Sequence, residues 1–339
     1  MATLSSFNIS ARRYLGNKTK LLPFILNITN KNCKNIRSVA DIFSGTGVVA
    51  SAFIDKTIYT NDILQSNYFC NVAWFSPENY DKDKIKFLLD DFNKYDKNEN
   101  NYMRENFADT YFSAKVCSKI GFIRESIDNL KESNKINEKE KAILITSLIY
   151  AMDKIAATCG HYDAYRKNAK LVNEINLTLP QFYNKLNINN QCFNKDANEL
   201  IKEIYADLIY IDPPYNSRQY SDTYHLLENI ATWKKPQVFG VARKMDRSMI
   251  KSKYCSNTAN DTFINLISNI NAKYILLSYN NMSTKGNNRS NAKISDEVII
   301  QSLSTRGEVS IFSQEHKAFS TGKSNIKDNY ERLFLCKCR

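Results

Sequence analysis

Metal-ligating side chains are scarce in this sequence. Its 339 residues include only three histidines, and none of the eight cysteines forms a Cys-x-x-Cys pair. Structural zinc sites need four ligands of these types at regular spacing, so we predict that the protein holds no metal. Scattered thiols are typical of a reducing compartment, and the N-terminus lacks a secretory signal core, so a cytoplasmic protein is expected.

Long apolar runs are missing as well. The most apolar stretch, residues 142–157, is interrupted by Asp153 and Lys154 and is too short to span a bilayer, so no membrane association is expected. Positive charge is plentiful instead, because 47 Lys and Arg residues against 35 Asp and Glu give a formal net charge of +12. This charge favours a polyanionic partner such as nucleic acid, although a merely solvated basic surface would carry it too.

The most informative stretch is Asp207–Tyr215, which reads DLIYIDPPY. Its apolar, β-branched first half predicts a buried strand, and the two prolines end that strand because proline cannot donate to a sheet ladder. Asp212 therefore stands at the carboxyl end of a strand, the edge at which open α/β sheets bind ligands.

The atoms at this strand end suit an exocyclic amine. The Asp212 carboxylate and the Pro213 carbonyl offer two acceptors for the two amine hydrogens, and Tyr215 offers a ring on which a base can stack. Holding both hydrogens turns the nitrogen lone pair toward an electrophile. On this motif alone, a proline-terminated strand that only leads into a turn remains the alternative.

A second strand end lies within residues 38–52, where a strand passes through Asp41 into a loop with Gly45 and Gly47 and then a helix. The glycines permit a tight turn and close approach of a ligand to the backbone. The third glycine of the dinucleotide fingerprint and a Gly-Lys-Ser/Thr ending are missing, which argues against a pyrophosphate or nucleoside triphosphate. The next strand ends at Asp62, placed to bind ribose hydroxyls, so an adenosine-type ligand without a phosphate chain is expected.

Two further features belong to this set. Asp196 ends a short predicted strand at residues 191–196, and a turn at Gly16 leads through Lys18 into a helix. The lysine and the first amides of that helix could hold a carboxylate or another anion. Taken singly, each strand-end acid could instead cap a helix, and the glycine turn could be an ordinary basic turn.

The middle of the chain differs in composition. Residues 79–106 are rich in charged residues and asparagine, and residues 139–158 carry apolar side chains at helical spacing. The aromatic and basic cluster Gly160–Lys167 follows, where stacking on bases and phosphate contacts are expected unless the loop is packed. A second basic stretch, residues 241–255, could lie over a phosphate backbone or simply be solvated.

Three more predicted strands, at residues 274–279, 308–312 and 332–338, complete the sheet. A polar stretch separates the last two, which predicts an antiparallel edge. His225 lies in a helix with apolar spacing, so we expect a core residue rather than a general base.

The order of these motifs is that of a known family. Lys18 after a glycine turn, the loop Asp41–Gly47, Asp62, Asp196 and Asp212–Tyr215 resemble the class alpha DNA adenine N6-methyltransferases of the Dam type. The resemblance extends over most of the chain apart from the middle. It implies an α/β fold, namely the Rossmann-like sheet of S-adenosylmethionine-dependent methyltransferases with an antiparallel last strand.

The resemblance also implies a division of the chain. Residues 1–66 and 171–339 would form the catalytic methyltransferase domain, and residues 67–170 would form an inserted, mostly helical target-recognition domain. The change in composition over the middle agrees with this division. Asn17 departs from the family pattern, because Dam-type enzymes often carry a second glycine there.

The family pattern, carried over by position, assigns the site residues. S-adenosylmethionine would be bound by Tyr14, Gly16, Asn17, Lys18, Asp41, Phe43, Ser44, Gly45, Thr46, Gly47, Asp62, Ile63, Asp196 and Ala197. The catalytic residues would be Asp212, Pro213, Pro214 and Tyr215. From the basic and aromatic clusters we expect nucleic-acid contacts by Tyr162, Arg166, Arg218, Arg243, Lys244 and Arg247.

The expected function is site-specific methylation of adenine N6 in double-stranded DNA, with the adenine flipped out of the helix. The aromatic cluster and residues 241–255 resemble the adenine methyltransferases that accompany restriction enzymes, so a cognate restriction endonuclease acting separately is an expected partner. A monomer associated with the nucleoid is expected. Two alternatives stay open: an RNA adenine N6-methyltransferase, and a catalytically inactive relative that binds nucleic acid.

Overall fold

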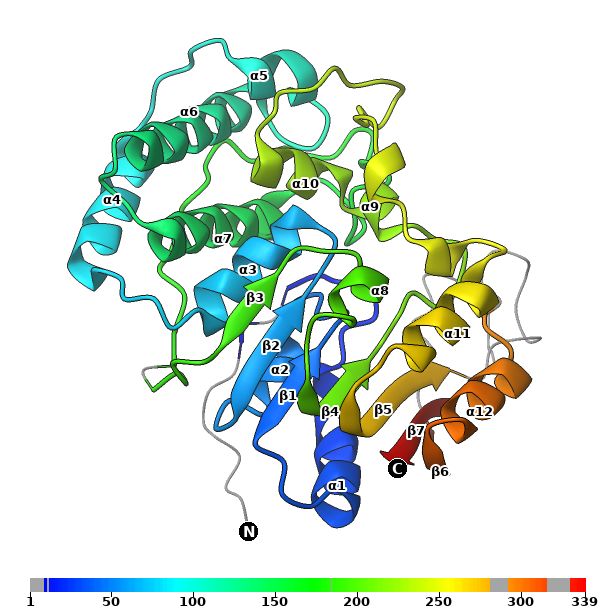
Figure 1. The fold of residues 1–339 in the computed structure, drawn as a ribbon. Coiled ribbons are helices and arrows are strands. Elements are labelled where there is room, and N and C mark those ends of the chain that lie inside the picture. The colour runs from blue at the N-terminus through cyan, green and yellow to red at the C-terminus, as the bar shows by residue number, and fades with distance from the viewer. Residues whose placement is uncertain (1–8, 11, 184, 281–291, 316–329) are drawn as a thin grey trace.

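The computed structural model describes residues 9–10, 12–183, 185–280, 292–315 and 330–339 (Figure 1). His316 lies outside the described residues. No helix within these ranges is both long and apolar enough to cross a membrane.

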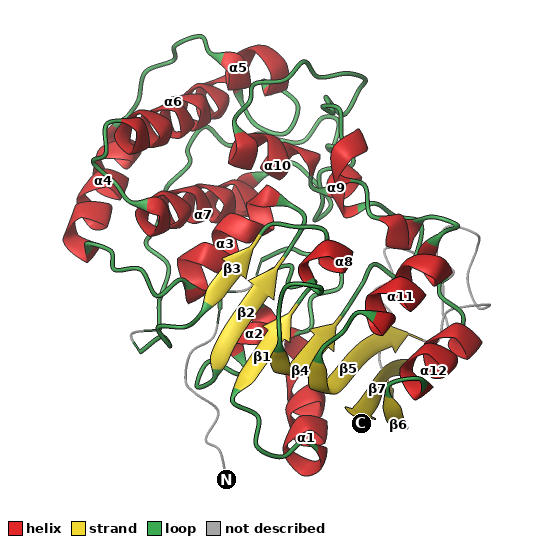
Figure 2. Cartoon of the chain, viewed as in Figure 1, coloured by secondary structure: helices red, strands yellow, loops and turns green. Residues whose placement is uncertain are grey.

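A seven-stranded sheet forms the centre of the molecule (Figure 2). Its strands follow the order β3-β2-β1-β4-β5-β7-β6, and the first five run parallel. β7 is antiparallel to both of its neighbours, which confirms the predicted Rossmann-like sheet with an antiparallel last strand. The strands are β1 (Ser38–Asp41), β2 (Thr57–Asn61), β3 (Gln191–Phe193), β4 (Ala206–Ile211), β5 (Ala272–Asn280), β6 (Gly307–Glu315) and β7 (Tyr330–Cys338).

Both faces of the sheet are buried at its central strands. Val39 and Leu208 pack on one side, whereas the next residues, Ala40 and Ile209, pack on the other. This explains why β4 is apolar along its whole length instead of alternating with polar residues. Helices that contribute to these two cores include α1 (Leu22–Asn32), α3 (Gln65–Phe75), α7 (Glu138–Ile155) and α10 (His225–Thr232) on the first side, and α8 (Ala197–Leu200), α11 (Ala259–Ser268) and α12 (Asp296–Ser304) on the second.

The chain between β2 and β3 is mostly helical up to Ile155, and no helix occurs in the described residues from there to β3 (Figure 1). In α7, the predicted helix of the middle segment, Asn137 and Glu140 form a reciprocal capping box at the first turn. The helices of this part are α3, α4 (Lys82–Lys94), α5 (Tyr102–Phe107), α6 (Ala114–Glu132) and α7.

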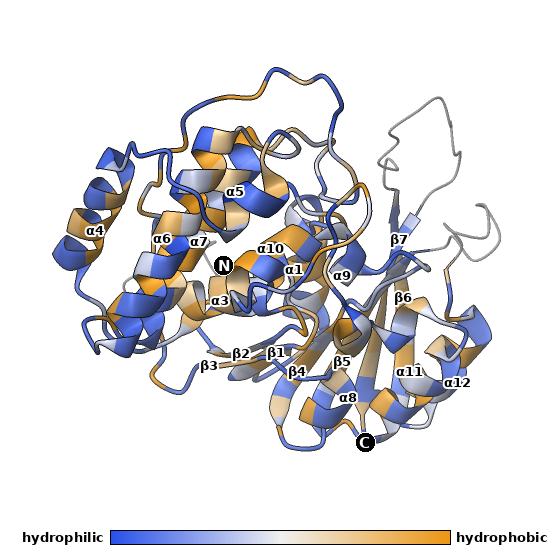
Figure 3. Ribbon diagram, turned by 90° about the horizontal axis from the view of Figure 1, so that it is seen from above, coloured by the Kyte–Doolittle hydropathy of each residue, from blue (hydrophilic) through white to orange (hydrophobic). Residues whose placement is uncertain are grey.

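The helical segment shares its core with the sheet. On α4, the buried residues Ile85, Leu89 and Phe92 form one stripe, and Figure 3 shows hydrophilic and hydrophobic positions alternating along this helix. The hydrophobic cluster that contains this stripe continues through α3 and α10 to β4. The division into two domains at residues 67 and 170 therefore does not coincide with two separate cores. Shorter helices complete the fold: α2 (Val48–Ser51), α9 (Tyr220–Thr223) and the 3₁₀ turns Thr19–Leu21, Ser248–Ile250 and Lys253–Cys255.

Candidate active site

The predicted strand-end acids meet in one cavity. Asp41 ends β1, Asp62 follows β2 and Asp212 follows β4, and all three line a cavity at the carboxyl ends of the parallel strands. Its empty space, open mouth included, is about 980 Å³. The position is the one at which open α/β sheets bind ligands, and the size suits a cofactor-sized molecule.

The glycine loop closes one wall of this cavity. Gly45 has φ of 50° and Gly47 has φ of 80°, a backbone conformation that favours glycine at both positions. The Gly45 amide donates to Oδ2 of Asp62 at 2.9 Å, and the Leu64 amide donates to Oδ1 of the same carboxylate at 2.8 Å. Burial raises the pKa of Asp62 to about 6, although these two amides oppose the shift. The loop therefore fixes the Asp62 carboxyl group at the cavity wall.

Asp41 is a buried residue of the same cavity. Its Oδ1 is buried and has no hydrogen-bond partner among the described residues. Burial, reinforced by the nearby Asp212 and Asp62 carboxylates, raises the pKa of Asp41 well above its ordinary value. A buried acceptor without a partner among the described residues, in an acidic cavity, suits a ligand that brings a hydrogen-bond donor or a positive charge.

Lys18 lies beside the proline-terminated strand end. The turn at Gly16 has φ of 74°, and the lysine that follows it is buried, with 5% of its surface exposed. Its Nζ lies 3.1 Å from Oδ1 of Asp212 and 2.8 Å from the hydroxyl of Tyr215. The ammonium expected to hold the end of the cofactor is thus already paired with the strand-end acid, although Lys18 also lines the cavity.

Tyr215 is turned toward the protein. Its hydroxyl donates to Oδ1 of Asp212 at 2.7 Å and lies 3.2 Å from Oγ of Ser278. Its ring meets Tyr279 edge-on at a centroid distance of 4.8 Å. Burial raises the pKa of Tyr215 well above its ordinary value, so the hydroxyl keeps its proton.

The cavity brings together nearly all residues expected at the cofactor. Of that set, only Gly47 is absent from the lining. This glycine is the N-cap residue of α2. A side chain at Gly47 would meet Asn71 at 2.7 Å and Phe75 at 2.8 Å, so the position serves packing against α3. At the strand end, Asp212 and Pro214 line the cavity, whereas Pro213 is buried and Tyr215, which is half-buried, is not part of the lining.

Sequence reasoning missed one wall of the cavity. The basic stretch 241–255 could have lain over a phosphate backbone or been solvated, but Ile250, Ser252 and Tyr254 within it line the cavity. Gln219 anchors this wall through two hydrogen bonds with the Ser252 backbone, at 2.8 and 3.0 Å. Tyr254 meets the ring of Phe43 edge-on at 5.1 Å. No motif marks these residues, because they reach the cavity through tertiary packing.

Tyr162 is not available for stacking on a base, which corrects the expectation for the aromatic cluster. Only 2% of its surface is exposed. Its hydroxyl donates to Oδ1 of Asp153 at 2.8 Å, and Asp153 forms a buried ion pair with Arg12 at 2.8 Å. Tyr162 is therefore part of the core, because a buried acid in α7 holds its polar end.

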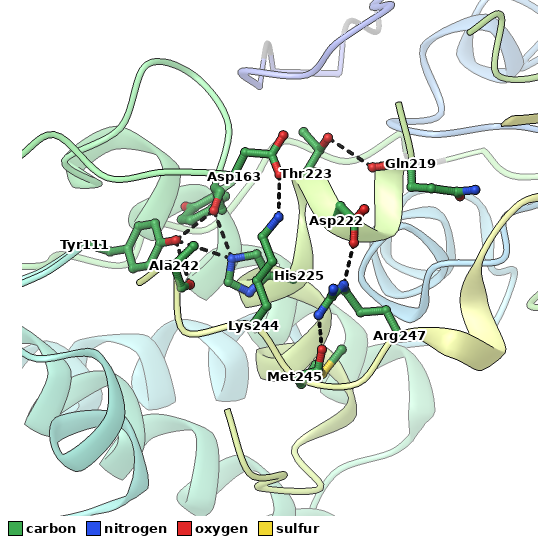
Figure 4. Close-up of polar contacts among 11 residues, drawn as sticks. Tyr111, Asp163, Gln219, Asp222, Thr223, His225, Ala242, Lys244, Met245 and Arg247 are labelled. Carbon is green, nitrogen blue, oxygen red and sulfur yellow. Dashed lines mark hydrogen bonds and ion pairs between the residues drawn. The ribbon is translucent and has the colours of Figure 1, made fainter. Parts of the chain in front are cut away.

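The predicted nucleic-acid cations fall into two groups. Lys244 and Arg247 are paired within the protein, with Asp163 at 2.7 Å and with Asp222 at 2.5 Å (Figure 4). Arg166, Arg218 and Arg243 are exposed.

His225 is a core residue, as predicted. It is fully buried, and its Nε2 lies 2.9 Å from the carbonyl of Tyr162 and 3.3 Å from the hydroxyl of Tyr111 (Figure 4). Burial lowers the pKa of His225 to about 4, so the imidazole is neutral at pH 7. The Tyr111 hydroxyl also donates to the carbonyl of Ala242 at 2.9 Å, which links the insert to the start of the basic stretch.

Comparison with known proteins gives one family and several relatives. The family model described as D12 class N6 adenine-specific DNA methyltransferase matches residues 14–288. The chain is 34% identical to the modification methylase StsI of Streptococcus sanguinis, over 95% of this chain and 51% of that protein. It is 29% identical to the modification methylase LlaI of Lactococcus lactis subsp. lactis, over 95% of this chain and 53% of that protein. It is 32% identical to the type II methyltransferase M.NlaIII of Neisseria lactamica, over 79% of this chain and 83% of that protein. The chain thus spans about half the length of the first two relatives.

Proposed function

The chain belongs to the D12 class of N6 adenine-specific DNA methyltransferases, and on this premise we propose that it transfers a methyl group from S-adenosylmethionine to N6 of a flipped-out adenine in duplex DNA. The observation that carries the proposal is the shared cavity of Asp212, Gly45 and Asp62. An amine acceptor and the wall of an adenosine-type site face the same space, as direct transfer between two bound molecules requires.

The cavity fits a donor that carries positive charge. Asp41 offers a buried oxygen, Oδ1, that has no hydrogen-bond partner among the described residues, and Asp62, which lines the cavity, would bind the ribose hydroxyls. Phe43 and Ala197 supply apolar surface for an adenine ring. When bound, S-adenosylmethionine supplies an electrophilic methyl group on a sulfonium. The protein's own part is to bind this molecule and to place the accepting amine in line with it.

The strand end would orient the amine of the target adenine. Oδ1 of Asp212 is held by Lys18 and Tyr215, whereas no hydrogen bond from another described residue reaches Oδ2. Oδ2 and the Pro213 carbonyl would therefore accept the two amine hydrogens. As the nitrogen is alkylated it becomes positively charged, and the Asp212 carboxylate stabilises that charge. The alkylated nitrogen then loses its proton without a strong base.

The DNA contacts follow from the exposed cations. Arg166, Arg218 and Arg243 would bind phosphates, which makes DNA binding dependent on salt concentration. The helical residues 67–170 would serve as the target-recognition domain of a class alpha, Dam-type enzyme. We further propose that the protein acts as a monomer in the cytoplasm at the nucleoid, beside a separately acting restriction endonuclease.

Methylation-aware sequencing tests this function directly. Duplex DNA free of prior methylation is incubated with the purified protein and S-adenosylmethionine, and N6-methyladenine is expected at one short sequence. A parallel reaction on structured RNA is expected to give no methylation. Transfer to RNA alone, or transfer to neither polymer, would reject the proposal.

A further inference from the structure

Glu331 is a buried acid near the start of β7. Only 8% of its surface is exposed, and β7 places it opposite Asn280 of β5 and Gln314 of β6. Its Oε1 lies 3.6 Å from Nζ of Lys18, while its Oε2 is buried without a hydrogen-bond partner among the described residues. Burying a carboxylate in this way is costly, so a role beyond packing is expected.

Lys18 stands between two carboxylates. Its Nζ contacts Asp212 at 3.1 Å and Glu331 at 3.6 Å, and it lies 4.8 Å from the ring centre of Tyr215. Burial pulls the pKa of Lys18 down, but the two carboxylates outweigh it and hold the pKa above its ordinary value, so the ammonium stays charged. With both carboxyl groups ionised, two carboxylates and one ammonium give this cluster one excess negative charge.

We propose that Glu331 is a positioning residue for methyl transfer, which holds the Lys18 ammonium against Asp212 and supplies the excess negative charge beside the accepting amine. The proposal rests on the function proposed above. Positive charge develops on the amine nitrogen during transfer, and a cluster that is already negative stabilises it without rearrangement. Without Glu331, Lys18 would neutralise Asp212 and the strand end would lose its net charge.

The same geometry predicts how Asp212 titrates. Burial raises the pKa of Asp212, Lys18 and the Tyr215 hydroxyl lower it, and Glu331 raises it. The other groups that act electrostatically in this part of the cavity are Asp41, Tyr210 and Tyr220. Removing the charge of Glu331 therefore lowers the pKa of Asp212. Since transfer needs the ionised carboxylate, the acid side of the pH–rate profile then moves to lower pH while the maximal rate falls.

Glu331→Gln separates this role from simple packing. Glutamine keeps the shape and an acceptor for Lys18 but removes the charge. Glu331→Asp restores the charge at shorter reach, and Glu308→Gln, on an exposed position of β6, is the matched control. The carboxyl ¹³C signal of Asp212, assigned with Asp212→Asn, is titrated in each protein, and single-turnover methyl transfer is measured across the same pH range.

Glu331→Gln is expected to lower the pKa of Asp212 and to reduce the maximal rate about tenfold. Glu331→Asp should restore most of the pKa of Asp212 and most of the maximal rate. Glu308→Gln should have the wild-type pKa of Asp212 and the wild-type rate. An unchanged Asp212 titration in Glu331→Gln overturns the inference whatever the activity. If the titration shifts as expected but the wild type methylates no DNA, the proposed function fails while the coupling between Glu331 and Asp212 stands.

Discussion

The hydroxyl of Tyr215 donates a 2.7 Å hydrogen bond to Oδ1 of Asp212, three residues before it in the chain. The tyrosine therefore fixes the carboxylate that we propose accepts a hydrogen bond from the adenine amine. Its ring is half-buried and packs edge-on against Tyr279, and Tyr215 is not among the residues that line the cavity.

Two substitutions separate the hydroxyl of Tyr215 from its ring. Tyr215→Phe removes one hydrogen bond to Asp212, and we expect a loss of about fivefold in the single-turnover rate. Tyr215→Ala also removes the stacking surface, worth roughly 1–3 kcal/mol, and should cost at least tenfold more. Fluorescence of 2-aminopurine at the target position reports flipping independently of transfer. Equal rates for the two variants would remove the ring from the mechanism.

Asp212→Ala is expected to abolish methyl transfer, with a loss of at least about a thousandfold, because the amine loses its charged acceptor. Binding of S-adenosylhomocysteine, measured by calorimetry, should be largely retained, since Asp41 and Asp62 remain. Asp261→Ala, at an exposed position of α11, serves as the control. Near-normal turnover of Asp212→Ala would reject the proposed role of this carboxylate.

The pairing of Lys244 with Asp163 predicts an unusual gain in DNA binding. Asp163→Asn releases the ammonium for a phosphate, so duplex affinity should rise and the slope of log K against log salt should steepen by about one. Lys244→Ala should leave the slope at its wild-type value, because that cation is already neutralised. Titrations by fluorescence anisotropy at several salt concentrations measure both. If the dependence of log K on log salt were clearly shallower in Lys244→Ala than in the wild type, the ion pair would have to open when the wild type binds DNA.

His225 predicts a specific dependence of stability on pH. Its pKa is lowered to about 4 by burial, below the ordinary value of 6.5. Between these two values the unfolded chain binds a proton that the folded protein does not, so this histidine makes stability fall as pH falls from about 6.5 to 4, by up to about 3 kcal/mol. Denaturant unfolding of wild type and His225→Gln over this range should show a difference that shrinks toward pH 4. A constant difference would contradict the shift.

The strands and the strand-end acids could be read from the sequence, because both follow from local rules. β-branched runs such as the one before Asp212 form strands wherever helices cover them, and an acid directly after such a run has only one edge to occupy. Gly45 was equally readable, since its position in a strand–turn–helix pattern demands a left-handed backbone.

The remaining features depend on contacts between distant parts of the chain. Tyr162 lies in a segment whose composition is typical of an exposed loop. It is buried because its hydroxyl bonds to Asp153, a buried acid of α7. Glu331 and Tyr254 carry no motif, and each reaches the site from a segment whose position is set only when the whole sheet and its covering helices assemble. Periodicity and spacing cannot report such meetings.

The position of β7 has a consequence for the order of events during synthesis. This strand follows the other six in the sequence, yet it is inserted between β5 and β6 and brings Glu331 to Lys18. While residues 330–338 of a nascent chain are still inside the ribosome, the sheet lacks the strand between β5 and β6, and the site lacks Glu331. The proposed methyl transfer is therefore expected only after translation has passed this strand and residues 330–338 have joined the sheet.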